Sequence, residues 1–240
     1  MPEKNVAVIL PAAGSGRRFG SEQNKLFALL GGKPIWWHSA NRFRAHPRVA
    51  RLVMPVSQTD RSRFQHEFAA AIGELGIELV AGGGQRTDSV RNGLDQLDGD
   101  TAIELVAVHD AARPLIRAAD LDAVLMRADQ TGAAILATPV TATVKQTDDS
   151  GVSCQTVDRS TLWLAQTPQV FRPSILRQAY QKHRGRPATD DAELVQRMGV
   201  NVALVGGSAD NIKITHPNDL VVAEAILTTQ QHSDTCNTTI

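Results

Sequence analysis

The sequence predicts an α/β fold in which helices cover both faces of a mostly parallel sheet. Two observations support this prediction: short apolar runs rich in β-branched residues recur along the chain, and helical patterns lie between most of them. Strands that alternate with helices in this way form parallel sheets that are buried on both faces. A third observation, a stretch that alternates like two exposed strands, adds a projecting β-hairpin arm.

The predicted strands are six apolar runs, namely residues 6–10, 51–56, 77–81, 103–108, 133–140 and 200–205. The predicted helices are residues 34–44, 60–72, 87–97 and 119–130. In the last of these, Leu121, Leu125 and Ala128 recur at intervals of four and three residues, which is the spacing of one helix face. Ligands of such sheets bind beyond the carboxyl ends of the strands, where the loops gather.

The stretch 141–159 breaks the alternation of strand and helix. Its sequence, TATVKQTDDSGVSCQTVDR, predicts two exposed strands joined by a DDSG turn. We expect a single nucleotide-binding domain over 1–240, with an arm at about 139–160 and a disordered polar tail from about 229. An arm with little core of its own is often ordered by pairing with a second subunit, so it suggests a homodimer.

Composition narrows the classes of function. The 240 residues are 42% hydrophobic and 21% charged, as in a globular protein with a full core. A formal net charge of zero removes the broad positive field that nucleic-acid binders use, and no apolar run approaches the roughly 20 residues that span a bilayer. Cys154 and Cys236 are too far apart for a CxxC metal or redox pair. We predict a cytoplasmic protein that binds neither nucleic acid nor membrane.

The loop PAAGSGRRFG after the first strand predicts phosphate binding. Gly14, Gly16 and Gly20 give the spacing GxGxxxG instead of the dinucleotide fingerprint GxGxxG, and no glycine precedes Lys25 as a P-loop requires. The small side chains still allow backbone N–H groups to approach phosphate oxygens, and Arg18 adds positive charge together with Lys25. A tight turn with solvated arginines is the alternative interpretation.

Seven motifs occur in order between about residues 5 and 227: PAAGSGRRFG, Lys25, VHDAARP (108–114), TVDR (156–159), QTPQVF (166–171), TDDAELV (189–195) and DNIKIT (210–215). This set resembles the 2-C-methyl-D-erythritol 4-phosphate cytidylyltransferase family of the non-mevalonate isoprenoid pathway. The resemblance implies a Rossmann-like nucleotidyltransferase fold, a homodimer joined by the arms, and Mg²⁺ or another divalent cation.

The resemblance also implies the reaction. A cytidylyl group would pass from CTP to 2-C-methyl-D-erythritol 4-phosphate, giving 4-diphosphocytidyl-2-C-methyl-D-erythritol and pyrophosphate. The similar ribitol-5-phosphate cytidylyltransferases share most of these motifs, so ribitol 5-phosphate is an alternative acceptor. A noncatalytic nucleotide-binding protein is the remote alternative. Such a protein would have lost charged residues at the phosphate-binding positions, whereas this sequence retains them.

The family's functional residues match particular positions of this sequence. Nucleotide binding is expected at Ala12, Ala13, Gly14, Gly16, Gly83, Asp88 and Ser89. The catalytic charges are expected to be Arg18, Lys25 and Lys213. Substrate binding is expected at Asp110, Arg113, Thr143 and Arg159, and metal binding at Asp110 and Asp210.

Cytidylyl transfer does not need a side-chain base. The attacking phosphate is already ionised, so positioning and electrostatics carry almost the whole reaction. We therefore predict that His109, next to Asp110, is a structural histidine. One departure from the family concerns Lys25, which Asn24 and Leu26 flank where relatives often have proline and glutamine.

Overall fold

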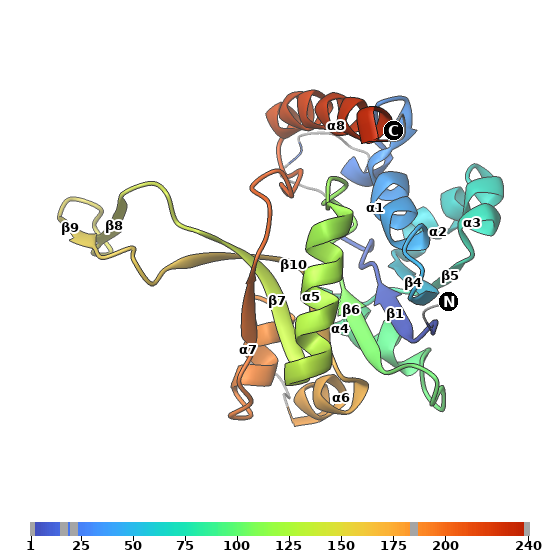
Figure 1. The fold of residues 1–240 in the computed structure, drawn as a ribbon, viewed down its shortest axis with the longest axis horizontal. Helices are drawn as coiled ribbons and strands as arrows, with labels where there is room; N and C mark the ends of the chain where they lie inside the picture. The colour runs from blue at the N-terminus through green and yellow to red at the C-terminus, as the bar shows by residue number, and fades with distance from the viewer. Residues whose placement is uncertain (1–2, 15–18, 20–23, 183–186, 238–240) are drawn as a thin grey trace.

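The computed structural model describes residues 3–14, 19, 24–182 and 187–237. Within these residues a seven-stranded sheet, ordered β11-β7-β10-β6-β1-β4-β5, forms the centre of the molecule (Figure 1). Its strands are β1 (Val6–Ile9), β4 (Val49–Val56), β5 (Ile77–Ala81), β6 (Leu105–Val108), β7 (Ala133–Pro139), β10 (Trp163–Phe171) and β11 (Ala203–Gly206). Neighbouring strands are parallel except at β10, which runs antiparallel to both β6 and β7.

The burial of strand β1 shows that both faces of the sheet are covered. Its side chains alternate between two hydrophobic clusters, with Val6 and Val8 in one and Ala7 and Ile9 in the other. All four residues are buried because helices cover both faces. An apolar run without polar alternation is the pattern expected of such a doubly covered parallel strand.

Two sets of helices cover the two faces. One face is packed by α1 (Ile35–Arg44), α2 (Gln58–His66), α3 (Ala69–Leu75), α5 (Ala118–Thr131) and α8 (Pro217–Asn237). The opposite face is packed by α4 (Arg86–Asp95), α6 (Pro173–Lys182) and α7 (Asp191–Gln196). A short 3₁₀ helix, η2 (Lys25–Phe27), precedes a small hairpin of β2 (Leu29–Leu30) and β3 (Lys33–Pro34).

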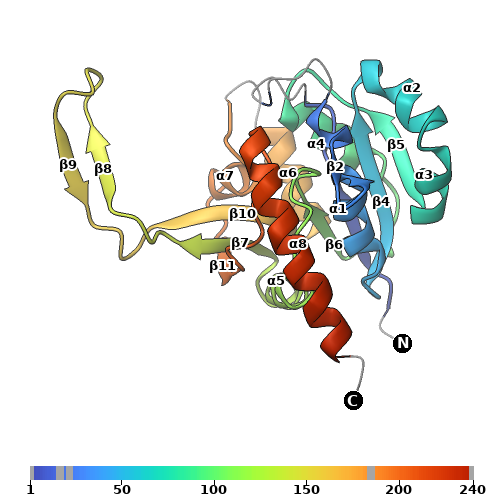
Figure 2. The same cartoon turned by 90° about the horizontal axis from the view of Figure 1, so that it is seen from above.

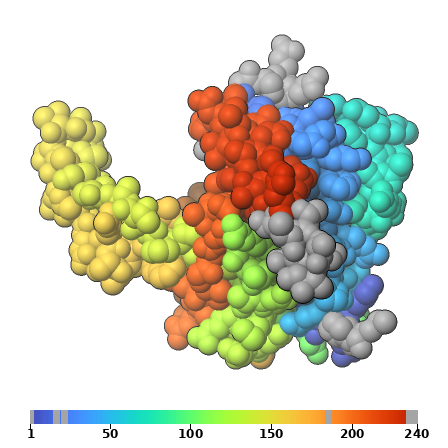
Figure 3. Space-filling view, turned by 45° about the horizontal axis from the view of Figure 1, so that its top comes forward, coloured from blue at the N-terminus to red at the C-terminus, as the bar shows by residue number. Residues whose placement is uncertain are grey.

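A hairpin arm projects from the domain, as the sequence predicts. Strands β8 (Val144–Thr147) and β9 (Cys154–Val157) pair antiparallel beyond the ends of β7 and β10 (Figure 2). The space-filling view shows that the arm stands away from the body (Figure 3). Most of its side chains are exposed, and Val152 near the tip is 90% exposed. The arm therefore contributes almost nothing to the core of its own chain.

Three details differ from the sequence predictions. The single helix predicted over 60–72 is wrong, because the chain forms two helices and Phe68 between them packs against Phe27 and Trp36. Strand β10 was not among the predicted strands. A disordered tail was predicted from about 229, but the described part of this segment, up to Asn237, continues α8, and Gln230 there donates to the Leu115 carbonyl at 3.1 Å. The six predicted strands are confirmed.

Candidate active site

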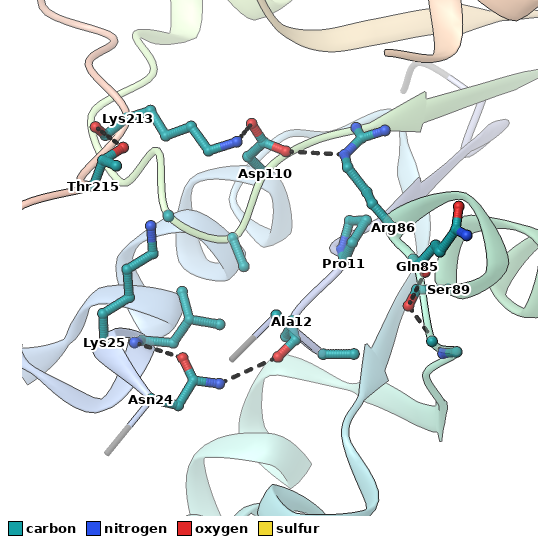
Figure 4. Close-up of a pocket in the computed structure, with 17 residues that line it drawn as sticks. Pro11, Ala12, Asn24, Lys25, Gln85, Arg86, Ser89, Asp110, Lys213 and Thr215 are labelled. Atoms are coloured by element: carbon teal, nitrogen blue, oxygen red, sulfur yellow. Dashed lines mark hydrogen bonds and ion pairs between the residues drawn. The ribbon is translucent and has the colours of Figure 1, made fainter. Parts of the chain in front are cut away.

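A pocket of about 570 Å³ opens at the carboxyl ends of β1, β5 and β6. Figure 4 shows its walls, which come from segments far apart in the sequence. They are residues 11–14 after β1, 24–26 in and before η2, 83–86 with Ser89 after β5, 110–112 after β6, and Lys213 with Thr215 before α8. Parallel strands gather their following loops at one edge, so the topology itself creates this pocket.

The first loop after β1 continues as a pocket wall. The Ala12 N–H donates to the Pro55 carbonyl at 2.8 Å, which extends the strand pairing into the loop. Ala12, Ala13 and Gly14 then line the pocket as predicted. The predicted Gly16 and Arg18 lie outside the described residues.

Side-chain hydrogen bonds fix the segment that contains Lys25. Asn24 accepts from the Leu26 N–H at 3.1 Å and donates to the carboxylate of Asp60 at 2.9 Å. The Asn24 amide also approaches the Ala12 carbonyl at 3.4 Å, which ties the segment to the first loop. Lys25 Nζ donates to the Ile214 carbonyl at 2.5 Å. The asparagine before the lysine thus anchors the segment by hydrogen bonds.

The loop after β5 requires glycine. A Cβ on Gly83 would lie 2.2 Å from the Cβ of Asp88, well inside any real contact. The Gly83 N–H donates to Ser89 Oγ at 3.0 Å, and Asp88 accepts from the Gln85 N–H at 3.1 Å as part of the cap of α4. Gly83 and Ser89 line the pocket, whereas Asp88 serves as a helix cap outside its lining.

Asp110 lies at the centre of a cluster of cations. Its carboxylate is 2.9 Å from Lys213 Nζ, 3.4 Å from Arg86 Nε and 3.6 Å from Arg113 Nε. Burial alone would raise the pKa of Asp110, but the charges of Arg86, Lys213 and Arg113 outweigh burial and hold this pKa well below its usual range. The carboxylate is therefore ionised and faces the pocket together with Lys213 (Figure 4).

His109 is a neutral structural side chain. Burial lowers its pKa to about 4, although hydrogen bonds to the backbone favour the charged form. Its Nε2 lies 2.9 Å from the Arg113 carbonyl, and its Nδ1 lies 3.1 Å from Thr167 Oγ1. Thr167 Oγ1 also accepts from the Asp110 N–H at 3.0 Å. The histidine thus fixes the loop that presents Asp110, which supports the structural interpretation.

Arg113 and Asp210 contact neighbouring segments and do not line the pocket. Arg113 donates to the Asn211 carbonyl at 2.7 Å and so joins the loop after β6 to the segment that carries Lys213. Asp210 pairs with Arg117. Neither Arg113 nor Asp210 is among the residues that line the pocket.

Thr143 and Arg159 lie at the base of the arm. Both are exposed, and Arg159 donates to the Thr141 carbonyl within the same base. Neither residue lines the pocket of its own chain. The fold of one chain therefore does not bring these two predicted substrate-binding residues to Asp110 and Lys213.

Sequence reasoning missed Arg86, Gln85 and Thr215, which line the pocket. Arg86 is the most informative of the three because it contacts Asp110 and, at 2.8 Å, the buried Asp191. A signal for it was present, since Arg86 stands between Gly83 and Ser89 in the same motif, at the first position of α4.

The described residues contain no group of three or more histidine, cysteine or acidic side chains placed to hold a metal ion. No helix among them is long and apolar enough to cross a bilayer. What the pocket offers is the ionised carboxylate of Asp110, the lysines Lys25 and Lys213 from two segments, and walls that contain Gly14, Gly83 and Gly84. These features define the class of nucleotide-binding proteins that handle phosphates by charge and position.

Comparison with known proteins gives the particular family. The family model for 2-C-methyl-D-erythritol 4-phosphate cytidylyltransferase (IspD) matches residues 6–229, so the chain belongs to this family. A protein of that name from Rhodopirellula baltica is 51% identical over 232 residues, which cover 93% of this chain and 95% of the relative. The chloroplastic protein of that name from Oryza sativa is 39% identical, over 94% of this chain and 75% of the relative.

Solved structures agree with this assignment. The crystal structure of 2-C-methyl-D-erythritol 4-phosphate cytidylyltransferase from Thermus thermophilus has a TM-score of 0.74 at 33% identity, and the match covers 94% of this chain and 98% of that one. A 4-diphosphocytidyl-2C-methyl-D-erythritol synthase structure has a TM-score of 0.76 at 32% identity, with 95% and 99% covered. The predicted nucleotidyltransferase fold is therefore confirmed.

Proposed function

We propose that this protein transfers the cytidylyl group of CTP to 2-C-methyl-D-erythritol 4-phosphate, with release of pyrophosphate, in isoprenoid precursor biosynthesis. Family membership supports the reaction, and one observation ties it to this chain. Lys25, Asp110 and Lys213, which are distant in the sequence, line a single pocket together with the glycine-containing loops. That pocket provides the charges that a reaction between two polyanions requires.

The residues of the pocket have separate roles in this proposal. Backbone N–H groups of the loop after β1 hold the CTP phosphates, and Lys25 stabilises the departing pyrophosphate. The methylerythritol phosphate attacks the α-phosphorus of CTP; the new P–O bond forms as the bond to the pyrophosphate oxygen breaks. Lys213 moves from Asp110 to the α-phosphate, where negative charge accumulates in the transition state. No proton has to be removed from the nucleophile.

A divalent cation such as Mg²⁺ fits beside Asp110. Magnesium binds through one or two carboxylates and completes its shell with phosphate oxygens and water, and Asp110 is an ionised carboxylate at the pocket wall. Such a cation would neutralise phosphate charge when it is bound. Asp210, the second predicted ligand, is paired with Arg117 and does not line the pocket, so we assign the carboxylate ligand to Asp110.

A homodimer explains the positions of Thr143 and Arg159. Both residues lie on an arm that projects away from its own domain (Figure 1). Exposed apolar residues, Trp163 and Leu164, lie where β10 leaves the body toward the arm, as expected of a surface that a second subunit covers. In the dimer, Arg159 of one protomer would orient the methylerythritol phosphate in the pocket of its partner.

The reaction is tested by following pyrophosphate release from CTP and 2-C-methyl-D-erythritol 4-phosphate in the presence of Mg²⁺. We expect release with the wild type, and a loss of about 10²-fold or more in Lys25→Ala. Lys182→Ala, at an exposed position at the end of α6, is the matched control and should behave as the wild type. The absence of release from the wild type contradicts the proposed reaction.

The shared site has its own test. Lys25→Ala and Arg159→Ala are expected to be nearly inactive when assayed separately. After subunit exchange at equal concentrations, half of the dimers are mixed, and each mixed dimer contains one intact site. Activity should then recover to about a quarter of the wild-type value. No recovery after verified exchange would show that Arg159 does not act across the dimer.

A further inference from the structure

We propose that Arg86 is a positioning residue that fixes the carboxylate of Asp110 through a buried ion pair with Asp191. This inference rests on the proposed cytidylyl transfer and adds to it a network that reaches the reacting groups through Asp110. The network consists of Arg86, Asp191, Tyr180 and Gln169. Figure 4 shows Arg86 on the side of Asp110 opposite Lys213.

Arg86 joins two carboxylates with different atoms of one guanidinium group. Its Nε lies 3.4 Å from Asp110 Oδ1, and its Nη1 lies 2.8 Å from Asp191 Oδ2. Lys213 approaches the other oxygen of Asp110, Oδ2, at 2.9 Å. The two cations therefore hold opposite oxygens of the same carboxylate, as Figure 4 shows. A planar guanidinium suits this double contact, whereas a lysine ammonium is a single point of charge.

Asp191 is itself rigidly held. Its side chain is fully buried, and Tyr180 donates its hydroxyl to Asp191 Oδ1 at 2.5 Å. The backbone N–H groups of Asp191 and Ala192 both donate to Gln169 Oε1, at 3.1 and 2.9 Å. Burial and the neighbouring carboxylate raise the pKa of Tyr180, so its hydroxyl stays protonated and donates.

Gln169 links Asp191 to the strand that leads to Asp110. In the sheet Gln169 of β10 pairs with Val108 of β6, two residues before Asp110. The start of α7 is thereby fixed relative to the end of β6, and Arg86 spans the distance from Asp191 to the Asp110 carboxylate. A guanidinium held in this way cannot follow the substrate phosphates without leaving Asp191 as an unpaired buried charge.

The arrangement has a consequence for turnover. Lys213 must leave Asp110 when it moves to the α-phosphate, whereas Arg86 stays because Asp191 retains it. The carboxylate then keeps its orientation during the step in which one of its two closest cations departs. Fixed charges of this kind lower a barrier because they do not have to reorganise as the reaction proceeds.

The test separates positioning from folding. Arg86→Met alone leaves the buried Asp191 without its cation and is expected to destabilise the fold. The double variant Arg86→Met/Asp191→Asn removes both charges, while the asparagine oxygen still accepts from Tyr180. We expect its thermal unfolding midpoint and its calorimetric affinity for CTP to stay near the wild-type values. We also expect its kcat to fall about 10- to 100-fold, with KM for CTP changed less than about 3-fold.

Two further variants sharpen the result. Arg86→Lys keeps the charge but not the double contact, so we expect it to recover less than a tenth of the lost kcat. Asp95→Asn, which removes an exposed charge from the same helix outside the network, should leave kcat within about 2-fold of the wild type.

The outcomes are distinct. Wild-type kcat in the stable double variant overturns the positioning role, because the network then serves folding alone. Full rescue by Arg86→Lys also overturns it, since bulk positive charge is then sufficient. A large rise in KM with unchanged kcat would make Arg86 a direct nucleotide ligand instead. If the wild type releases no pyrophosphate, the proposed reaction fails, and this inference fails with it.

Discussion

Substitution of Lys213 by methionine removes the charge that we place on the α-phosphate and keeps most of the volume of the side chain. A unit charge at about 4 Å from a phosphate oxygen contributes about 4 kcal/mol at the effective dielectric constant of about 20 that suits a protein surface. Lys213 must first give up its ion pair of 2.9 Å with Asp110, and its side chain is 39% exposed to screening water. We therefore expect a net loss of about 3 kcal/mol, or about 10²-fold in kcat.

Steady-state kinetics with saturating methylerythritol phosphate measure this loss. Lys213 contacts Asp110 in the free protein, and we propose that it contacts the α-phosphate only in the transition state, so KM for CTP should change by less than about 3-fold. Lys182→Met, at an exposed lysine far from the pocket lining, is the matched control. A loss in kcat below about 5-fold, or a loss that appears entirely in KM, would refute this role for Lys213.

Three further predictions address the loops, the metal and the core. Gly83→Ala should weaken CTP binding by about 10-fold or more in calorimetry, because a Cβ would lie 2.2 Å from that of Asp88; unchanged affinity would show that the loop yields freely. Chelation of divalent cations should abolish pyrophosphate release and added Mg²⁺ should restore it, whereas persistent release would remove the metal from the mechanism. Burial lowers the pKa of His38 from 6.5, a shift that the nearby Arg42 reinforces and Glu224 opposes, so the folded state binds fewer protons than the unfolded state and stability falls as pH drops through this range. Between about pH 7.5 and about pH 5.5, the free energy of unfolding in urea should decrease more for the wild type than for His38→Gln, and equal decreases would contradict this.

The sheet was predictable wherever a strand is apolar along its whole length. Strand β1 and its parallel neighbours are buried on both faces, and this burial selects the β-branched runs that the sequence displays. Strand β10 was not predictable in this way. Its middle, Gln166 to Gln169, contains polar side chains that bond to neighbouring loops and to α7, so it lacks an apolar run although it is buried. Tertiary hydrogen bonds replace the hydrophobic signal there.

The site was predictable to a similar extent. Motifs located the loops after β1, β5 and β6, and the topology brings these loops to one pocket. Arg86 lies within one of these motifs, but its ion pairs with Asp110 and Asp191 were not predictable, because the three residues come from segments that meet only in the folded chain. Contacts between distant segments leave no spacing pattern in the sequence. Thr143 and Arg159 lie outside the pocket of their own chain, and in the dimer that we propose their neighbours would belong to the second subunit.

The proposed reaction of this pocket is cytidylyl transfer to methylerythritol phosphate. A comparison of kcat/KM for 2-C-methyl-D-erythritol 4-phosphate with that for ribitol 5-phosphate tests it, with CTP and Mg²⁺ held constant and pyrophosphate release as the signal. We predict a preference of about 100-fold or more for methylerythritol phosphate, which corresponds to about 3 kcal/mol of transition-state binding. Equal values, or a preference for ribitol 5-phosphate, would contradict the assigned acceptor.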